Sequence, residues 1–168
     1  MLFLPYLATA ATPRWNAQAR AAFIGLSFAH GRSEMIRAVL EGVVLEVRDM
    51  MASWPQAGVH VDQIRLGGGA TKSALWNHIQ ADVYGRPVQL LMSGESTALG
   101  AAILGGVGAG IFDSIAEGVH HMVHVTGVIE PDMANHQRYE HLYQAYVQAY
   151  EGLTRSRVFE TLAHIQAG

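Results

Sequence analysis

The feature of this sequence best suited to chemistry is a run of three glycines, Gly67, Gly68 and Gly69. The run lies between an apolar segment of strand type and a segment with helical spacing. Glycine lets the backbone approach a ligand closely, and N–H groups at the start of a helix point toward an anion. Such a turn could hold a nucleotide phosphate. Glycines also make tight turns without any ligand, so the run alone leaves both interpretations open.

Familiar phosphate-binding and catalytic motifs do not fit the chain. A P-loop requires glycine immediately before its lysine, and Thr71 precedes Lys72 here. No GxGxxG spacing fits residues 67–73, which excludes the dinucleotide fingerprint. The GxSxG nucleophile elbow is absent as well, so an acyl-transfer triad is unsupported.

Two further groups of residues are candidates for function. His120, His121 and His124 could suggest a metal site, but they have neither HExxH spacing nor a paired carboxylate, so solvated or capping roles are favoured. Glu41 next to Gly42 could be a functional carboxylate, whereas the family resemblance set out below suggests an internal polar contact beside a glycine that permits close packing. We assign no metal ligand and no catalytic residue.

The elements around the glycine run follow an alternating pattern. Residues 64–66 predict a short strand, and residues 73–84 predict a helix closed by Gly85. Residues 87–92 predict a second strand, followed by a helix from Glu95 or Ser96 to about residue 105. Two strand-helix units in tandem indicate a parallel sheet. Gly100, Ala101 and Ala102 in this second helix predict close packing beside the glycine turn.

Two longer helices flank this region. Apolar residues recur every three or four positions over residues 33–54, which predicts an amphipathic helix with Gly31 as N-cap, Glu34 in its first turn and Pro55 at its end. Residues 135–155 predict a final helix whose buried face is expected to comprise these residues: His141, Leu142, Ala145, Tyr146, Ala149 and Tyr150. Residues 1–31 show no sustained period and predict a loop-rich lead-in.

Composition limits the class of protein. The chain has 168 residues, 50% hydrophobic and 15% charged, which suits one domain with a real core. A net charge of −3 without basic runs argues against nucleic acid as a partner. The absence of cysteines excludes disulfides and fits a cytoplasmic location. No apolar stretch reaches the roughly 20 residues that span a bilayer, so we expect no membrane association.

The segment IRLGGGATKSALWNHIQADVYGRPV, residues 64–88, resembles the adenosine-binding segment of FGGY-family carbohydrate kinases. The resemblance covers nearly the whole chain and includes LPYL, TPRW, RAVLEGV, TALGAAILGGVGAGIF and PDMANHQRYEHLYQAY. It implies an α/β fold: a truncated C-terminal lobe of the actin-like, ribonuclease H-like ATPases, helix-rich with a small, partly parallel sheet. Residues 1–168 would then be the C-terminal, nucleotide-binding domain, incomplete at its N-terminal side.

The resemblance also implies a nucleotide site. Gly68, Gly69 and Ala70, with Gly67 before them, would lie against the phosphates and ribose of ATP or ADP, which the complete enzyme binds with Mg²⁺. Ser73 stands where relatives often place an asparagine near the adenine. Ser73 also suits a helix N-cap, and both roles can hold together. Trp76 is interpreted as core and not as a base-stacking platform.

By the same resemblance, the complete protein would transfer the γ-phosphoryl group of ATP to a sugar hydroxyl. LPYL and TPRW favour the xylulokinase-like branch and a pentulose such as xylulose. The family's catalytic aspartate belongs to the preceding lobe, and no aspartate of this chain matches it: Asp49, Asp62, Asp82, Asp113 and Asp132. The isolated chain is therefore expected to be inactive as a kinase. Its expected partner is the missing N-terminal lobe or a second copy of the chain.

Departures from the family pattern keep an alternative open. Residues 9–13 read TAATP where the xylulokinase-like branch often has GERTP, and His78 replaces a usual glutamine. These changes put nucleotide affinity in doubt. The alternative is a non-catalytic module that binds nucleotide or associates with itself.

Overall fold

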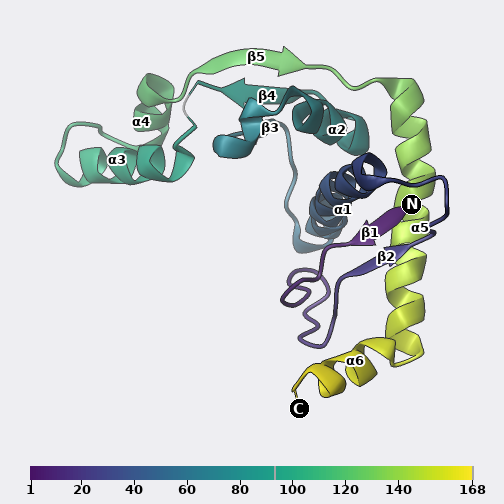
Figure 1. The fold of residues 1–168 in the computed structure, drawn as a ribbon. Coiled ribbons are helices and arrows are strands. Elements are labelled where there is room, and N and C mark those ends of the chain that lie inside the picture. The colour runs from purple at the N-terminus through teal and green to yellow at the C-terminus, as the bar shows by residue number, and fades with distance from the viewer. Residues whose placement is uncertain (93, 168) are drawn as a thin grey trace. The chain divides into compact units, whose positions relative to one another are not determined.

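The computed structural model describes residues 1–92 and 94–167 (Figure 1). The chain divides into two compact units, Met1–His60 with Met133–Gly168 and Val61–Asp132. We refer to the first as the terminal unit, because it contains both chain ends, and to the second as the central unit. Across the described ranges, no helix is both long enough and apolar enough to cross a membrane.

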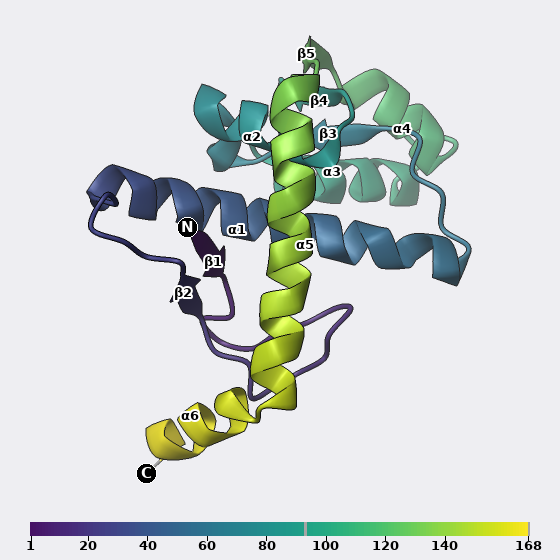
Figure 2. The same cartoon turned by 90° about the vertical axis from the view of Figure 1, so that its right-hand side faces the viewer.

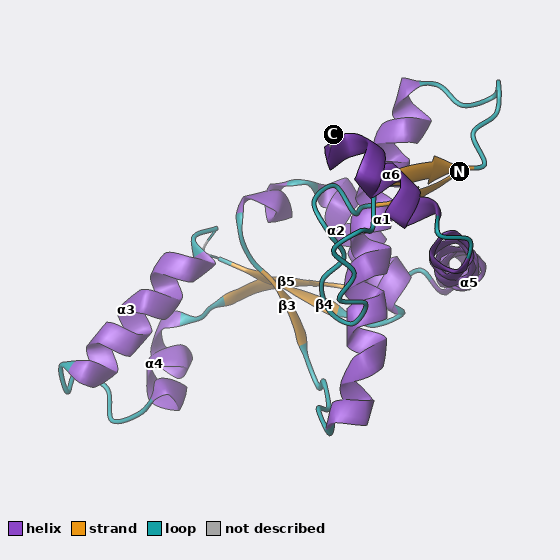
Figure 3. Ribbon diagram, turned by 90° about the horizontal axis from the view of Figure 1, so that it is seen from below, coloured by secondary structure: helices purple, strands orange, loops and turns teal. Residues whose placement is uncertain are grey.

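The central unit contains a three-stranded sheet in the order β3-β4-β5 (Figure 1). Figure 3 shows its strands in orange. β3 (Ile64–Leu66) lies parallel to β4 (Val88–Leu91), and α2 (Ala74–Tyr84) connects them. These three elements and the parallel pairing confirm the prediction. β5 (Val125–Ile129) pairs antiparallel with β4 and was not predicted, because its five residues carry a glycine and little alternation. The sheet is therefore mixed and only partly parallel.

The core of the central unit lies between the sheet and α2. Leu66, Ala81 and Val88 are buried together. Four partly buried side chains pack around them: Ile64, Tyr84, Leu90 and Ile129. α2 ends as predicted at Gly85, which has a φ of 62°, because glycine adopts the left-handed conformation without steric cost.

A helical hairpin completes the central unit. α3 (Ser96–Gly108) extends past its predicted end, and α4 (Ile115–Met122) was not predicted. A Cβ atom at Gly106 would lie 2.7 Å from the Phe112 ring, so this glycine permits the contact that closes the hairpin. The close packing expected at Gly100, Ala101 and Ala102 is wrong: no atom of residues 1–92 and 94–167 lies within 4 Å of a Cβ position at Gly100, and both alanines are exposed.

The terminal unit combines two crossing helices with a short hairpin (Figure 2). The hairpin pairs β1 (Leu2–Leu4) with β2 (Ala22–Ile24) in antiparallel register. α1 (Arg32–Ser53) and α5 (Met133–Arg155) agree closely with the predicted helices, and both contact β1. A further helix, α6 (Val158–Ala167), was not predicted.

The two ends of α1 follow the signals in the sequence. Gly31 is the N-cap, and its N–H donates to Glu34 Oε2 at 2.8 Å. This bond satisfies one of the free N–H groups at the helix start and places a carboxylate at the positive end of the helix dipole. At the other end the chain tightens into the 3₁₀ turn η1 (Trp54–Ala57), where Pro55 has no N–H to continue the helix.

The contact between β1 and α1 explains the pair Glu41 and Gly42. A Cβ atom at Gly42 would lie 2.3 Å from the backbone oxygen of Phe3, so only glycine fits. Glu41 accepts hydrogen bonds from Arg37 Nε at 2.7 Å and from the Tyr139 hydroxyl at 2.8 Å. These contacts agree with the structural interpretation, an internal polar tie beside a close backbone contact.

The lead-in is loop-rich as expected, yet much of it is core. Its buried members are Leu2, Phe3, Leu4, Tyr6, Ala10 and Ala19. The Tyr6 hydroxyl donates to Glu46 Oε2 of α1 at 2.9 Å and lies 2.7 Å from the Tyr146 hydroxyl of α5. Tyr146 also donates to Glu46. One carboxylate thus joins the lead-in to both helices.

A second polar cluster lies further along the lead-in. Arg14 donates to both Asp49 oxygens, from Nε at 2.9 Å and from a terminal nitrogen at 3.1 Å. Tyr143 donates to the same carboxylate at 2.9 Å, and the Arg14 guanidinium lies 4.3 Å from the centre of the Tyr150 ring. A bidentate ion pair of this kind fixes direction as well as distance.

The buried face of α5 agrees in part with the predicted one. Tyr146 and Tyr150 are buried and Leu142 and Ala149 half-buried, as predicted, whereas His141 and Ala145 are exposed. Tyr139 is buried and Tyr143 half-buried instead, because the carboxylates of Glu41 and Asp49 on α1 accept hydrogen bonds from their hydroxyls, and apolar character alone does not reveal such acceptors.

The covered tyrosines of α5 and the lead-in predict how the free energy of unfolding changes at alkaline pH. Burial raises the pKa of Tyr139 and of Tyr143 to about 12. Burial also raises the pKa of Tyr6 and of Tyr146 well above the ordinary value. Because these folded-state values exceed the unfolded value of roughly 10, the stabilisation is complete below about pH 10 and is lost as the pH rises through the folded-state values. Tyrosine absorbance and circular dichroism, followed on the same pH series, should change together above about pH 10. Ionisation of most tyrosines near pH 10 in a chain with native dichroism would contradict this.

Candidate functional site

The glycine run forms the turn between β3 and α2, as the sequence predicted. It passes through a short 3₁₀ turn, η2 (Gly69–Lys72), before α2 begins. Gly67, Gly69, Ala70 and Ser73 are exposed, and Gly68 is half-exposed. The predicted site residues therefore lie together on one accessible turn.

Gly67 has a structural reason to be glycine. A Cβ atom there would lie 2.0 Å from Ser96 Oγ, at the first residue of α3. The Ser96 side chain therefore occupies the space that a side chain at position 67 would need, and any other residue there would require the serine to turn away.

Gly68 and Gly69 present backbone to the surface. Gly68 has a φ of 90°, a conformation that residues with a side chain rarely adopt. A Cβ atom at Gly68 or at Gly69 would meet no atom of the described residues within 4 Å. In the described part of the chain, neither N–H group has an acceptor. An open turn with free N–H donors suits an anionic group such as a nucleotide phosphate.

Ser73 is the N-cap of α2. Its Oγ accepts a hydrogen bond from the Trp76 N–H at 3.3 Å, which confirms the capping interpretation. The hydroxyl hydrogen remains available as a donor, so capping does not exclude contact with a ligand. Trp76 itself is half-buried, and its Nε1 is buried without a partner among the described residues.

Two residues that sequence reasoning missed hold the turn in shape. The Thr71 N–H and hydroxyl both donate to the Gly68 oxygen, at 3.2 and 2.7 Å. Asn77 Nδ2, from the first turns of α2, donates to the Thr71 oxygen at 2.7 Å. No sequence motif marks Thr71 and Asn77 as a pair, because they meet only in the folded turn.

The aspartates and histidines considered as candidate site residues occupy structural positions. Asp49 is held by Arg14 and Tyr143, and Asp82 accepts the Asp132 N–H at 2.8 Å. His120 and His121 lie in the last turn of α4. Within residues 1–92 and 94–167, no three or more histidine or acidic side chains are grouped closely enough to hold a metal ion.

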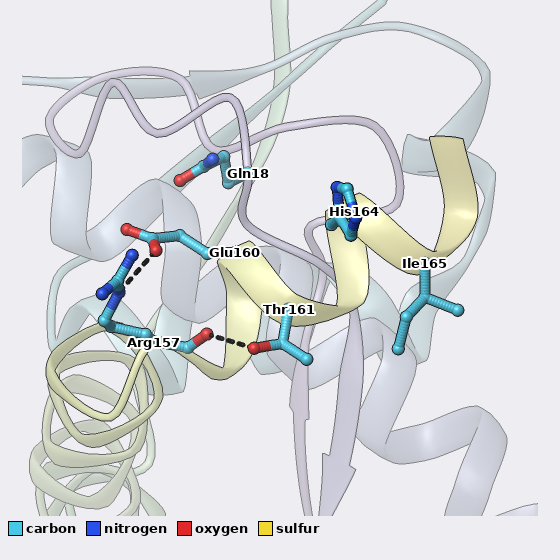
Figure 4. Close-up of a pocket in the computed structure, with 6 residues that line it drawn as sticks. All are labelled: Gln18, Arg157, Glu160, Thr161, His164 and Ile165. Carbon is cyan, nitrogen blue, oxygen red and sulfur yellow. Dashed lines mark hydrogen bonds and ion pairs between the residues drawn. The ribbon is translucent and has the colours of Figure 1, made fainter. Parts of the chain in front are cut away.

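A hollow of about 540 Å³ in the terminal unit lies along α6 (Figure 4). Its lining comprises Gln18, Arg157, Glu160, Thr161, His164 and Ile165. Arg157 Nε donates to Glu160 at 2.6 Å, and the Thr161 hydroxyl donates to the Arg157 oxygen at 3.1 Å. Several of its polar groups are therefore bonded to each other across the start of α6, and we assign it no chemistry.

Comparison with known proteins gives consistent matches. Residues 1–109 match the model of the FGGY family of carbohydrate kinases, C-terminal domain. A xylulose kinase of Staphylococcus epidermidis is 37% identical over 151 residues, covering 90% of this chain and 30% of the relative. The chain thus spans about 30% of the length of the curated relatives it matches.

Solved structures agree with this. A xylulose kinase from Rhodospirillum rubrum is 33% identical, with a TM-score of 0.79 over 95% of this chain and 31% of that one. A glycerol kinase of Plasmodium falciparum, solved with ADP, is 26% identical, with a TM-score of 0.70 over 88% of this chain and 30% of that one. The matches confirm the predicted fold class, a helix-rich α/β lobe of the actin-like ATPases with a small sheet.

The three glycines predict three different responses to alanine. We expect Gly67→Ala to destabilise the chain by about 1 to 3 kcal/mol through overpacking against Ser96, and Gly68→Ala by a similar amount through backbone strain. Gly69→Ala is the matched control and should change the free energy of unfolding little, because its space is open. Urea unfolding measures all three. Ser96→Ala should restore part of the loss in Gly67→Ala only, and equal losses of stability at all three glycines would contradict the roles assigned to them.

Proposed function

The chain belongs to the FGGY family of carbohydrate kinases, as part of its C-terminal domain, and on this premise we propose that it is the ATP-binding portion of a sugar kinase. The complete enzyme would transfer the γ-phosphoryl group of ATP to a sugar hydroxyl. The observation that carries the proposal is the exposed turn at residues 67–70, with two N–H donors and open space above Gly68 and Gly69.

In this proposal the turn binds the nucleotide through backbone atoms. The Gly68 and Gly69 N–H groups would donate to phosphate oxygens, and Ala70 would lie against the ribose. The Ser73 hydroxyl would donate to the adenine while its oxygen keeps capping α2 at Trp76 N. Donors already fixed in the fold cost little to organise when the ligand binds.

Other components of the reaction would come from outside this chain. Phosphoryl transfer needs a base to accept the hydroxyl proton and a cation to neutralise charge on the phosphates. The described residues offer no group of ligands for Mg²⁺. We therefore propose that Mg²⁺ arrives on the phosphates of the nucleotide, and that the catalytic base belongs to an N-terminal kinase lobe that pairs with this chain.

The proposed sugar is a pentulose such as xylulose. Two observations support it: the LPYL and TPRW segments, and a relative of 37% identity named xylulose kinase. The residues of the turn face the nucleotide in this proposal, so they do not select the sugar.

Binding of Mg-ADP to the purified chain tests the nucleotide proposal. Isothermal titration should detect binding, and Gly69→Leu should abolish it, because the new side chain would occupy the open space over the turn without disturbing the fold. The matched control is Gly152→Leu in α5, another glycine with nothing within 4 Å of its Cβ position, which should bind as the parent does. A folded chain that binds no Mg-ADP or Mg-ATP would overturn the proposal.

Catalysis by the chain alone is expected to be absent. An assay for ADP release from Mg-ATP, run with xylulose, glycerol and gluconate in turn, should show no sugar-dependent turnover, because no base is assigned within the chain. Sugar-dependent turnover would contradict this expectation and would identify the sugar directly.

A further inference from the structure

Hydrogen bonds within the turn fix the backbone that carries Gly68 and Gly69. Among the described residues, no atom lies within 4 Å of a Cβ position at either glycine, so the side on which a side chain would stand is open. The Gly68 oxygen instead accepts two hydrogen bonds from Thr71, at 3.2 Å from its N–H and at 2.7 Å from its hydroxyl. The path of the glycines therefore depends on the position of Thr71.

Thr71 is in turn fixed by one buried side chain. Asn77 is only 3% exposed, and its Nδ2 donates to the Thr71 oxygen at 2.7 Å. The Oδ1 of Asn77 is buried and has no partner among the described residues. Leaving this acceptor unpaired costs free energy, and the oxygen does nothing to orient the side chain. The hydrogen bond from Nδ2 to the Thr71 oxygen therefore sets the orientation of the amide.

The helix that carries Asn77 does not need this bond. The start of α2 is capped by Ser73, which accepts the Trp76 N–H. The Asn77 backbone N–H donates to the Ser73 oxygen whatever the side chain is. Loss of the amide nitrogen would therefore affect the turn and leave the helix start in place.

We propose that Asn77 is a positioning residue of the nucleotide site, which holds the Gly68 and Gly69 N–H groups in the geometry that receives phosphate by way of Thr71. The inference rests on the proposed function of the turn. Asn77 touches no ligand in this arrangement. It acts by removing the freedom of a turn that would otherwise have to be ordered at the moment of binding.

Amide hydrogen exchange without nucleotide tests the positioning role directly. Asn77→Asp is isosteric but its ionised form cannot donate, and Asn77→Ala removes the group without adding charge. In both variants the Thr71 and Ser73 N–H groups, which bond within the turn, should exchange about tenfold faster than in the parent. The Gly85 N–H, bonded to Ala81 at the far end of α2, is the internal control and should be unchanged. Unchanged exchange at Thr71 and Ser73 in a folded Asn77→Ala chain would overturn the inference.

Titration with Mg-ADP supplies the second readout. Both variants should bind about tenfold more weakly than the parent, and replacement of an exposed amide residue on α5, Gln148→Ala, should have no such effect. As the pH falls, the affinity of Asn77→Asp relative to the parent should recover, because a protonated carboxyl regains a donor for the Thr71 oxygen. Parent-like affinity in both variants would overturn the inference while leaving the proposed function intact. A parent chain that binds no nucleotide would instead overturn the proposed function, whatever the exchange result.

Discussion

In the terminal unit, β1 rests on α1 at a position without a side chain. A Cβ atom at Gly42 would lie 2.3 Å from the Phe3 backbone oxygen, so a side chain there would force β1 or α1 to move. In the central unit, a Cβ atom at Gly67 would lie 2.0 Å from Ser96 Oγ, where the serine side chain would have to turn away. The placement of the β1–β2 hairpin therefore depends on the absent side chain at Gly42.

Polar groups then determine how the lead-in is held. Glu46 of α1 accepts hydrogen bonds from Tyr6 and Tyr146, and Asp49 one turn later is paired with Arg14 and Tyr143. Removing one partner of such a cluster leaves a buried group unsatisfied, which costs more than the bond itself contributes. The lead-in, which has little regular structure, is thereby made part of the core of the terminal unit.

The glycine turn combines order with openness. Among the described residues, the space for a side chain is filled at Gly67 and open at Gly68 and Gly69, while Thr71 and Asn77 bond the turn in place. A turn packed on all sides would have no room for a ligand, and one held by nothing would have to be ordered during binding. In the proposed function, this arrangement would suit the turn to a nucleotide.

The sequence by itself determined the elements whose signals are local. The period of residues 33–54, Gly31 with Glu34, the glycines after residues 64–66 and the cap at Ser73 each depend on neighbours a few positions away, and the structure confirms them. The run of motifs also indicated the family, because many short segments in a fixed order carry more information than any one of them. Only the tertiary structure decided the antiparallel placement of β5, the face of α5 that is buried, the backbone contact that requires glycine at Gly42 and the bond from Asn77 to Thr71. These features depend on pairs of residues that meet only after folding, and propensity and spacing along the chain do not encode which distant groups will supply a hydrogen bond or fill a space.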